Sequence, residues 1–254
     1  MVDLHCHILS GMDDGAKSFK ESLAMAEMAI ADGITHVVAT PHSSPEFRFD
    51  YAKVQREAEK LQAALGNKLI LATGCDFHLS PENISALKKA RSPFCIHQKD
   101  YLLVEFNEFA IPPAMDQKLY EIQLAGMRPV ITHPERNAIL RAQPERLEKW
   151  IRNGCYGQVT GGSLTGGFGS NIEAASRNWI AQGLVHFIAS DAHNTTTRPH
   201  KLLAAYRVVQ QEFGKEKAEA LFVKNPLAAF EGRGLPHIPE VSGPPPKKKR
   251  FLFF

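Results

Sequence analysis

Short apolar runs rich in β-branched residues alternate with segments of helical spacing along most of this 254-residue chain. Seven of the runs are predicted to be strands, at residues 2–5, 35–40, 69–74, 101–106, 129–133, 156–160 and 186–190. Helices are predicted between and after them, near residues 22–31, 50–65, 81–90, 113–125, 144–153, 171–182, 199–213 and 215–224. Regular alternation with several fully apolar strands is typical of a parallel α/β fold.

Residue types that bind metals occur at the ends of these strands. The first strand ends in Asp3-Leu4-His5-Cys6-His7; side chains alternate along a strand, so His5 and His7 face the same side about 7 Å apart. Candidate ligands follow six of the seven strands. An open doubly wound sheet, the competing topology, gathers its ligands at one crevice. Ligands at so many strand ends favour a (β/α)7-type barrel, in which all these ends meet.

The candidate metal ligands are nine side chains: His5, His7, Asp14, His42, Asp76, Glu105, His133, Asp191 and His193. Any one alone is readily explained as a hydrogen-bonded core residue, but several buried carboxylates together need a counter-cation. Nine ligands of this kind are enough to bind about two to three metal ions. Mixed imidazole and carboxylate ligands favour Mn, Fe or Zn. Structural roles are predicted for the remaining histidines, His36, His78, His97, His186, His200 and His237.

Two arginines stand close in sequence to these ligands. Arg136 ends His133-Pro134-Glu135-Arg136, and Arg198 follows His193 in the same predicted loop. Arginine binds phosphate with two parallel hydrogen bonds and stays charged, so the pair suggests a phosphate ester substrate; surface salt bridges are the alternative. The glycine-rich run at residues 161–169 either approaches an anionic ligand or acts as a hinge.

Bulk properties narrow the class of protein. The formal charge of +3 comes largely from residues 247–250, so no nucleic-acid-binding surface is expected. No signal peptide and no membrane-length apolar run are recognised. Four cysteines without C-x-x-C pairing fit buried, reduced thiols and a cytoplasmic protein. Residues 241–254, rich in proline and then lysine, are predicted to be a disordered extension after a barrel domain at residues 1–240.

The opening residues 1–16 and four later motifs resemble one family. These motifs are Thr40-Pro41-His42, Val104-Glu105-Phe106, Thr132-His133-Pro134-Glu135-Arg136-Asn137 and Ser190-Asp191-Ala192-His193-Asn194. Together they resemble the tyrosine phosphatases of the PHP (polymerase and histidinol phosphatase) superfamily, which are manganese-dependent enzymes of bacterial capsule and exopolysaccharide loci. The resemblance covers residues 1 to about 235 and leaves the tail outside.

The resemblance implies a distorted (β/α)7 TIM-like barrel, the PHP fold, with a three-metal site. One metal would be held by His5, His7, Glu105 and Asp191; a second by Asp76, Glu105 and His133; a third by Asp14, His42 and His193. Arg136 and Arg198 match the family's phosphate-binding arginines and are the predicted catalytic residues. The family often has Glu where this chain has Asp76, so occupancy or metal identity at the second position is expected to differ.

The predicted function is hydrolysis of phosphotyrosine by a metal-activated hydroxide, with two to three Mn ions, or Fe or Zn in their place. The expected substrate is the tail of a tyrosine kinase that regulates exopolysaccharide or capsule synthesis. No nucleic-acid partner or stable membrane insertion is expected, and a homo-oligomer is left open. Phenolate, with a pKa of about 10, leaves with less need of protonation than an alkoxide.

Several alternatives remain open. A PHP phosphoesterase acting on histidinol phosphate or a nucleotide would use the same site, and a regulator could bind phosphotyrosine without cleaving it. Amidohydrolase-like barrels usually carry a bridging lysine, and no lysine stands at a predicted strand end here. Cysteine-based phosphatases need an arginine six residues after the cysteine; Met12, Pro81, Tyr101 and Gly161 occupy those positions.

Overall fold

The computed structural model describes residues 1–242. Its strand segments are β1 (Val2–Cys6), β2 (His36–Ala39), β3 (His42–Ser43), β4 (Ile70–Thr73), β5 (Asp76–His78), β6 (Tyr101–Glu105), β7 (Arg128–Thr132), β8 (Tyr156–Thr160) and β9 (Phe187–Ala189). Every pairing among them is parallel, in the orders β1-β2-β4 and β3-β5-β6-β7-β8-β9. Thr40-Pro41 separates β2 from β3 and Gly74-Cys75 separates β4 from β5, so the nine segments occupy seven barrel positions.

The ring closes between its first and last strands. The backbone N–H of Asp191 donates to the carbonyl of His5 at 2.8 Å, and the N–H of His7 donates to the carbonyl of Ala192 at 2.8 Å. The predicted parallel α/β barrel is therefore confirmed. Its distortion lies in the two interrupted positions, where the pairing passes from one short segment to the next.

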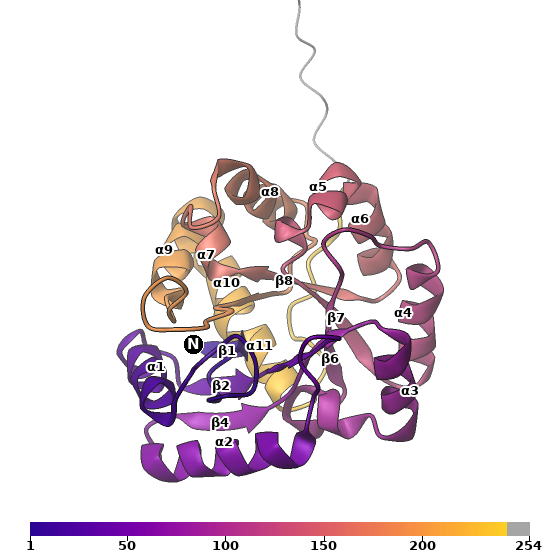
Figure 1. Ribbon diagram of the computed structural model, residues 1–254. Helices are drawn as coiled ribbons and strands as arrows, with labels where there is room; N and C mark the ends of the chain where they lie inside the picture. The colour runs from indigo at the N-terminus through magenta and orange to yellow at the C-terminus, as the bar shows by residue number, and fades with distance from the viewer. Residues whose placement is uncertain (243–254) are drawn as a thin grey trace, which may run out of the picture.

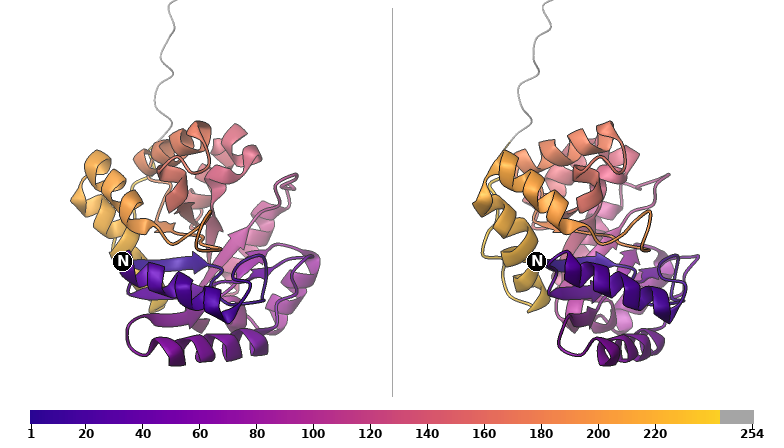
Figure 2. Two further views of the ribbon diagram at one scale, coloured as in Figure 1. Left: turned by 60° about the vertical axis from the view of Figure 1, so that its left-hand side comes forward. Right: turned by 90° about the vertical axis from the view of Figure 1, so that its left-hand side faces the viewer.

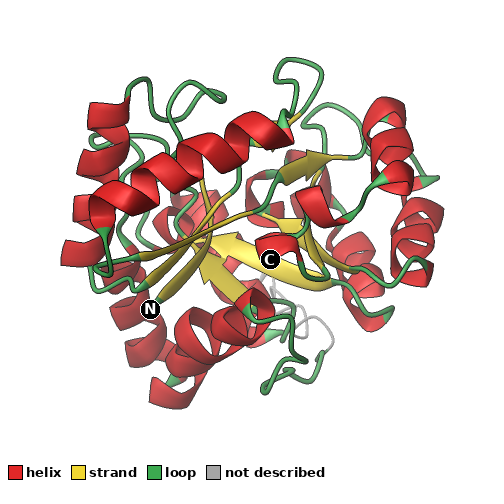
Figure 3. Ribbon diagram, turned by 90° about the horizontal axis from the view of Figure 1, so that it is seen from below, coloured by secondary structure: helices red, strands yellow, loops and turns green. Residues whose placement is uncertain are grey.

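Helices surround the strands in Figure 1, and the view of Figure 3, turned by 90°, again shows helices outside the strands. They are α1 (Phe19–Ala31), α2 (Tyr51–Leu65), α3 (Pro81–Lys89), α4 (Met115–Leu124), α5 (Ala138–Ala142), α6 (Pro144–Arg152), α7 (Gly161–Leu164), α8 (Ser170–Ala181), α9 (Leu202–Phe213), α10 (Lys215–Glu219) and α11 (Asn225–Phe230). Single turns η1 (Ser92–Phe94), η2 (Ile96–Gln98), η3 (Pro134–Arg136) and η4 (Ala220–Lys224) connect some of them.

The C-terminal helices extend further than predicted. The sequence suggested a last helix near 215–224 that stops before Asn225-Pro226, but α10, η4 and α11 continue to Phe230. Pro226 lies in the first turn of α11, where a proline needs no backbone N–H. These helices lie beside the N-terminus of the chain (Figure 2). The first residues of the glycine-rich run after β8 form the short helix α7.

Two apolar layers hold the barrel. The outer layer packs the helices against the strands, and the inner layer fills the lower part of the barrel interior. The inner layer includes Leu4, Val38, Leu103, Val130 and Phe187 from the strands, and Ala228, Ala229 and Phe230 of α11 close it from below. Burial of this apolar surface leaves the upper, C-terminal end of the strands as the place for polar side chains.

A register shift in β1 lets this strand contribute side chains both to the apolar interior and to the polar end of the barrel. Asp3 is paired with Val37 and Cys6 with Ala39, so β1 carries one more residue than β2 over this stretch. Leu4 belongs to the inner apolar layer, whereas Cys6 belongs to the outer layer. The extra residue lets both Leu4 and His5 face the interior, which is how irregular pairing re-aims side chains next to functional sites.

Other predictions concern the cysteines, the tail and membranes. All four cysteines are free and buried, as expected. Val241 and Ser242 still contact the barrel, since the Ser242 N–H donates to the Gln182 carbonyl at 3.0 Å; residues 243–254 of the predicted tail lie outside the described residues. No helix within residues 1–242 has the length and apolar character needed to cross a membrane.

Candidate metal centre

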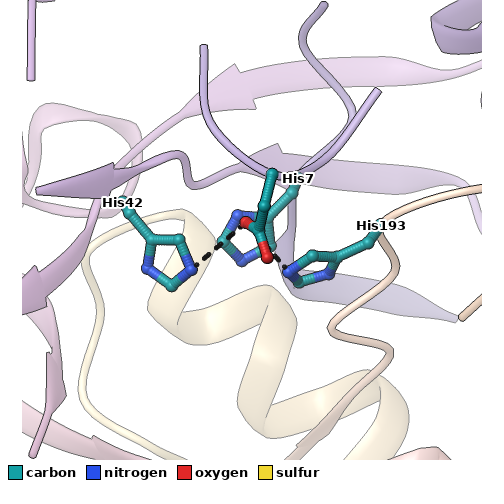
Figure 4. A group of neighbouring side chains, drawn as sticks. His7, His42 and His193 are labelled. Carbon is teal, nitrogen blue, oxygen red and sulfur yellow. Dashed lines mark ion pairs between the residues drawn. The ribbon is translucent and has the colours of Figure 1, made fainter. Parts of the chain in front are cut away.

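All nine predicted ligands lie at the C-terminal end of the barrel. One group combines His7, Asp14, His42 and His193, whose donor atoms all lie within 4.8 Å of one another. The Asp14 Oδ1 atom is 3.6 Å from His42 Nε2 and 3.5 Å from His193 Nε2. Figure 4 shows the two rings on either side of a carboxylate, with His7 behind it. This group contains the three residues predicted for the third metal.

Asp76 lies at the centre of the remaining donors. Its Oδ2 atom is 3.3 Å from His5 Nε2, 3.3 Å from His42 Nδ1 and 3.9 Å from His133 Nε2. Asp76, Glu105 and His133 form one compact group, as predicted for the second metal, and His5, His7 and Asp76 form another. The short Asp76 side chain therefore reaches both groups from the buried start of β5.

Glu105 and Asp191 lie on different sides of the cluster. Glu105 is close to His42, His78 and His133, with Oε2 3.4 Å from His42 Nδ1. Asp191 Oδ1 lies 3.5 Å from His5 Nε2 and 3.4 Å from His7 Nε2. The resemblance grouped Glu105 with His5, His7 and Asp191; here Asp76, 3.3 Å from His5 Nε2, is the carboxylate that joins Asp191 at the Nε2 atoms of that histidine pair. The assignment of donors to individual ions stays a prediction.

Both predicted arginines face Asp191. Arg136 Nη1 and Arg198 Nη2 each form an ion pair with Asp191 Oδ2, the second at 2.5 Å. The guanidinium of Arg136 also lies over the Phe168 ring, 4.9 Å from its centroid. Arg198 Nε is buried and has no hydrogen-bond partner among the described residues. Two cations therefore border the cluster on the Asp191 side.

Hydrogen bonds to Nδ1 fix three of the histidine rings. His5 Nδ1 donates to Gln158 Oε1 at 2.9 Å, and His7 Nδ1 donates to Asp13 Oδ2 at 2.7 Å. His193 Nδ1 donates to the Asp191 carbonyl at 2.9 Å. Each bond leaves Nε2 of its ring facing the cluster, and such partners of a liganding histidine set its tautomer and orientation.

Sequence reasoning missed Asp13 and His78. Asp13 holds His7 and also accepts from the backbone N–H of His42 at 3.0 Å; its position beside Asp14 was the available signal. His78 was predicted to have a structural role, yet it contacts Glu105 and forms a possible donor group with His42 and Glu105. Asp76-Phe77-His78 repeats the donor–x–donor spacing of His5-Cys6-His7, so the same strand alternation predicts His78 on the site face.

A buried network below the cluster joins β1 to the end of β9. Asp3 accepts from the Ser190 backbone N–H at 2.9 Å and from Ser190 Oγ at 2.5 Å. His200 Nδ1 lies 3.0 Å from Asp3 Oδ2. The structural role predicted for His200 is consistent with these contacts, because they fix the backbone directly before Asp191.

The backbone itself is strained at two site residues. His133 and Asp191 have positive φ values of 31° and 52°. Residues other than glycine rarely adopt this region and are found there mostly at functional sites. His133 follows β7 directly and Asp191 lies two residues after β9, so each turn sets the direction of a cluster side chain just beyond a strand.

Opposite charges outweigh burial at Asp191, His42 and His5, whereas burial lowers the pKa of His193. Burial would raise the pKa of Asp191, but His5, His7 and the two arginines hold that pKa well below its usual value. Burial would likewise lower the pKa of His42, yet the neighbouring carboxylates of Asp76 and Glu105 raise it to about 11. The pKa of His5 is raised to about 9, because Asp76 and Asp191 overcome the effect of its burial. Carboxylates at this site are therefore charged and need cations.

The donor set fits divalent transition-metal ions. His42 Nδ1, Asp76 Oδ2 and Glu105 Oε2 are buried polar atoms with no hydrogen-bond partner among the described residues. Buried polar atoms without partners are rare and call for an ion or water. Imidazole and carboxylate ligands without thiolate suit Mn, Fe or Zn rather than the all-oxygen shells of Ca or Mg.

Comparison with known proteins identifies the family. The family described as "Capsular polysaccharide synthesis, CpsB/CapC" matches residues 1–231. This chain belongs to the CpsB/CapC family. The tyrosine-protein phosphatase YwqE of Bacillus subtilis (strain 168) is 35% identical over 257 residues, covering 100% of this chain and 99% of YwqE. The tyrosine-protein phosphatase CpsB of Streptococcus agalactiae serotype V is 30% identical over 239 residues, 89% of this chain and 96% of CpsB.

Solved structures agree with this membership. A crystal structure from work on YwqE of Bacillus subtilis and CpsB of Streptococcus pneumoniae, described as unique metal-dependent tyrosine phosphatases, matches with a TM-score of 0.88 at 33% identity. The match covers 96% of this chain and 100% of the other. An organophosphorus hydrolase variant matches with a TM-score of 0.59 at 14% identity, which supports the barrel architecture alone. The resemblance to PHP-type capsule phosphatases is thus confirmed at the level of the family.

Proposed function

We propose that this CpsB/CapC family member is a metal-dependent tyrosine-protein phosphatase of the non-cysteine type. The observation that carries the proposal is the position of Arg136 and Arg198, which both face the carboxylate of Asp191 at the edge of a buried cluster of histidines and carboxylates. The similarity to YwqE and CpsB, both named tyrosine-protein phosphatases, supports the same activity.

The residues at the cluster have separate roles in this proposal. His5, His7, Asp14, His42, Asp76, Glu105, His133, Asp191 and His193 would hold two to three ions, Mn first and Fe or Zn as alternatives. Such ions lower the pKa of bound water and neutralise charge on a phosphoryl group. Asp13 and Gln158 keep His7 and His5 oriented through their Nδ1 atoms.

The two arginines bind the phosphoryl group of the substrate. Their guanidinium groups are held at the cluster edge by Asp191, and their N–H groups suit the oxygens of a phosphate ester. Charge that develops on those oxygens during transfer is stabilised by fixed cations, and loss of one such donor costs about 10²–10³ in kcat. The phenolate of tyrosine leaves readily, because its conjugate acid has a pKa of about 10.

The proposed substrate is a phosphotyrosine-bearing protein, in the first place the tail of a tyrosine kinase that regulates capsule or exopolysaccharide synthesis. This finer assignment rests on the capsular polysaccharide synthesis description of the family. A cytoplasmic location is part of the same proposal, since that is where such a tail and reduced thiols would be found.

Purified protein with its metals quantified would be assayed on a phosphotyrosyl peptide and on histidinol phosphate, with and without a chelator. We expect chelator-sensitive cleavage of the peptide and about two to three metals per chain. The His5→Ala variant should lose both the cleavage activity and the bound metal. Preference for histidinol phosphate would replace the tyrosine phosphatase with a small-molecule phosphatase. Bound metal without cleavage of either ester would overturn the phosphatase proposal in favour of a phosphotyrosine-binding regulator.

A further inference from the structure

A groove leads away from the cluster on the side of Glu105. It consists of two adjoining cavities of about 380 and 390 Å³, which share the lining residues Pro45, His78, Glu105, Phe106 and Asn107. The first cavity also reaches Asp14 and His42 of the metal cluster. A group bound at the cluster can therefore extend directly into this space, which we call the Glu105 groove.

Apolar side chains form much of its wall. The Phe47 ring is stacked on His42 with an interplanar angle of 16° and a centroid distance of 5.9 Å. Phe109 lines the same cavity with 89% of its surface exposed, the most exposed large apolar side chain among the described residues. Leu79 and Met115 line the further cavity. An aromatic ring fits between such walls, since aromatic pairs stack at centroid distances of about 4.5–7 Å.

The rim of the groove is acidic. Glu46 and Glu108 are exposed and line the cavity next to the cluster, and no lysine or arginine is among the described residues that line either cavity. The opposite side of the cluster differs, because a cavity of about 300 Å³ beside Asp191 is lined by Arg198, Lys201 and several threonines. A phosphorylated ligand thus meets cations at its phosphoryl end and carboxylates along the groove.

We propose that the Glu105 groove binds the tyrosyl ring and neighbouring residues of the substrate, and that Glu46 and Glu108 select peptides with lysine or arginine beside the phosphotyrosine. The inference rests on the proposed phosphatase function and adds the substrate class to it. Phe47 and Phe109 hold the ring, while the two glutamates attract the flanking cations.

The test compares two phosphotyrosyl peptides that differ only in carrying lysine or glutamate on both sides of the phosphotyrosine. The measured quantity is the ratio of kcat/KM for the lysine peptide to that for the glutamate peptide. In the wild type we expect a ratio of roughly five, in the range that partly screened surface charge pairs provide. In the charge-reversal variant Glu46→Lys/Glu108→Lys the ratio should fall below one.

A matched control carries the same change of charge elsewhere. Glu27→Lys/Glu59→Lys reverses two exposed glutamates on α1 and α2, neither of which lines the groove, and should keep the wild-type ratio. A second variant, Phe109→Ala, should raise KM for both peptides about fivefold if the ring contacts this side chain.

The outcomes separate this inference from the proposed function. Chelator-sensitive turnover of p-nitrophenyl phosphate by the wild type, with a peptide ratio of one, would overturn the inference and leave the phosphatase proposal standing. Equal kcat/KM ratios in the charge-reversal variant and the control would also overturn the inference and leave the phosphatase proposal standing. Absence of turnover of p-nitrophenyl phosphate and of both peptides would overturn the phosphatase proposal and this inference with it.

Discussion

Asp3 and Ser190 are 187 positions apart in sequence, yet the Asp3 carboxylate accepts hydrogen bonds from both the backbone N–H and the hydroxyl of Ser190. Asp3 is fully buried, and its other partners are the His200 ring and the backbone N–H of His5. The pair connects the first strand with the residue that immediately precedes Asp191. Asp3 is therefore a positioning residue, which acts on the metal cluster through the backbone.

Replacing Asp3 should destabilise the fold and weaken metal binding together. In Asp3→Ala the Ser190 N–H and hydroxyl lose their acceptor inside the protein, which should cost about 3 kcal/mol in the free energy of unfolding. Urea denaturation and metal analysis would measure the two effects. Asp3→Asn keeps one acceptor oxygen and should recover part of the stability and part of the metal binding. Normal metal content in a destabilised Asp3→Ala protein would contradict the positioning role.

Gly15 should not tolerate a side chain. A Cβ atom there would lie 2.1 Å from the carbonyl oxygen of His7, so the loop carrying Asp13 and Asp14 would have to move away. We expect Gly15→Ala to lose metal affinity and at least about 2 kcal/mol of stability. Calorimetric titration with Mn²⁺ and a thermal melt would show this. Gly234→Ala is the matched control, because a Cβ there meets nothing within 4 Å.

His78 should contribute to metal binding although it was not among the nine predicted ligands. It contacts Glu105 and lies in one compact group with His42. Removal of a group that holds a ligand carboxylate costs about 10–100-fold in metal affinity, so we expect His78→Gln to fall in this range. His36→Gln, on β2 and outside every group of candidate donors found among the described residues, is the control. Equal affinities in the two variants would assign His78 no role at the cluster.

Metal-free protein should lose stability at alkaline pH. The folded-state pKa values of His5 and His42 are raised to about 9 and about 11 from an ordinary value of 6.5, against the effect of their burial, by the neighbouring carboxylates. The stabilisation from protonated rings is fully present below pH 6.5 and is lost as the pH rises through about 9 and then about 11. Melting temperatures of chelator-treated protein across this range would measure the loss.

The affinity for metal should rise with pH, opposite to the trend in the stability of the metal-free protein. A ligating imidazole must be neutral, so at neutral pH an entering ion displaces the protons held by these two histidines, and apparent affinity should rise with pH. Titrations in buffers of different ionisation enthalpy would count the released protons. Affinity that is constant from pH 6 to about 9 would contradict this pH dependence.

The sequence patterns predicted the barrel and the location of its cluster because both follow from periodicity. Strand ends of a parallel barrel meet at one face, so the sequence predicts that His5, Asp76 and Asp191 lie close together. The register shift in β1 and the positive φ values of His133 and Asp191 were not predictable in this way. They arise from tertiary packing, as does the contact between His78 and Glu105, which depends on how two neighbouring strands are aligned.

The closure of β9 against β1 has a consequence for how the protein is made. His5 and His7 leave the ribosome long before Asp191 and His193, because the strand segments β2 to β9 lie between them in sequence. A nascent chain that ends before β9 holds most of the donors but lacks the strand that aligns them. The complete set of donors therefore comes together only after β9 has been synthesised, and truncated products of interrupted synthesis that end before β9 would lack a complete site.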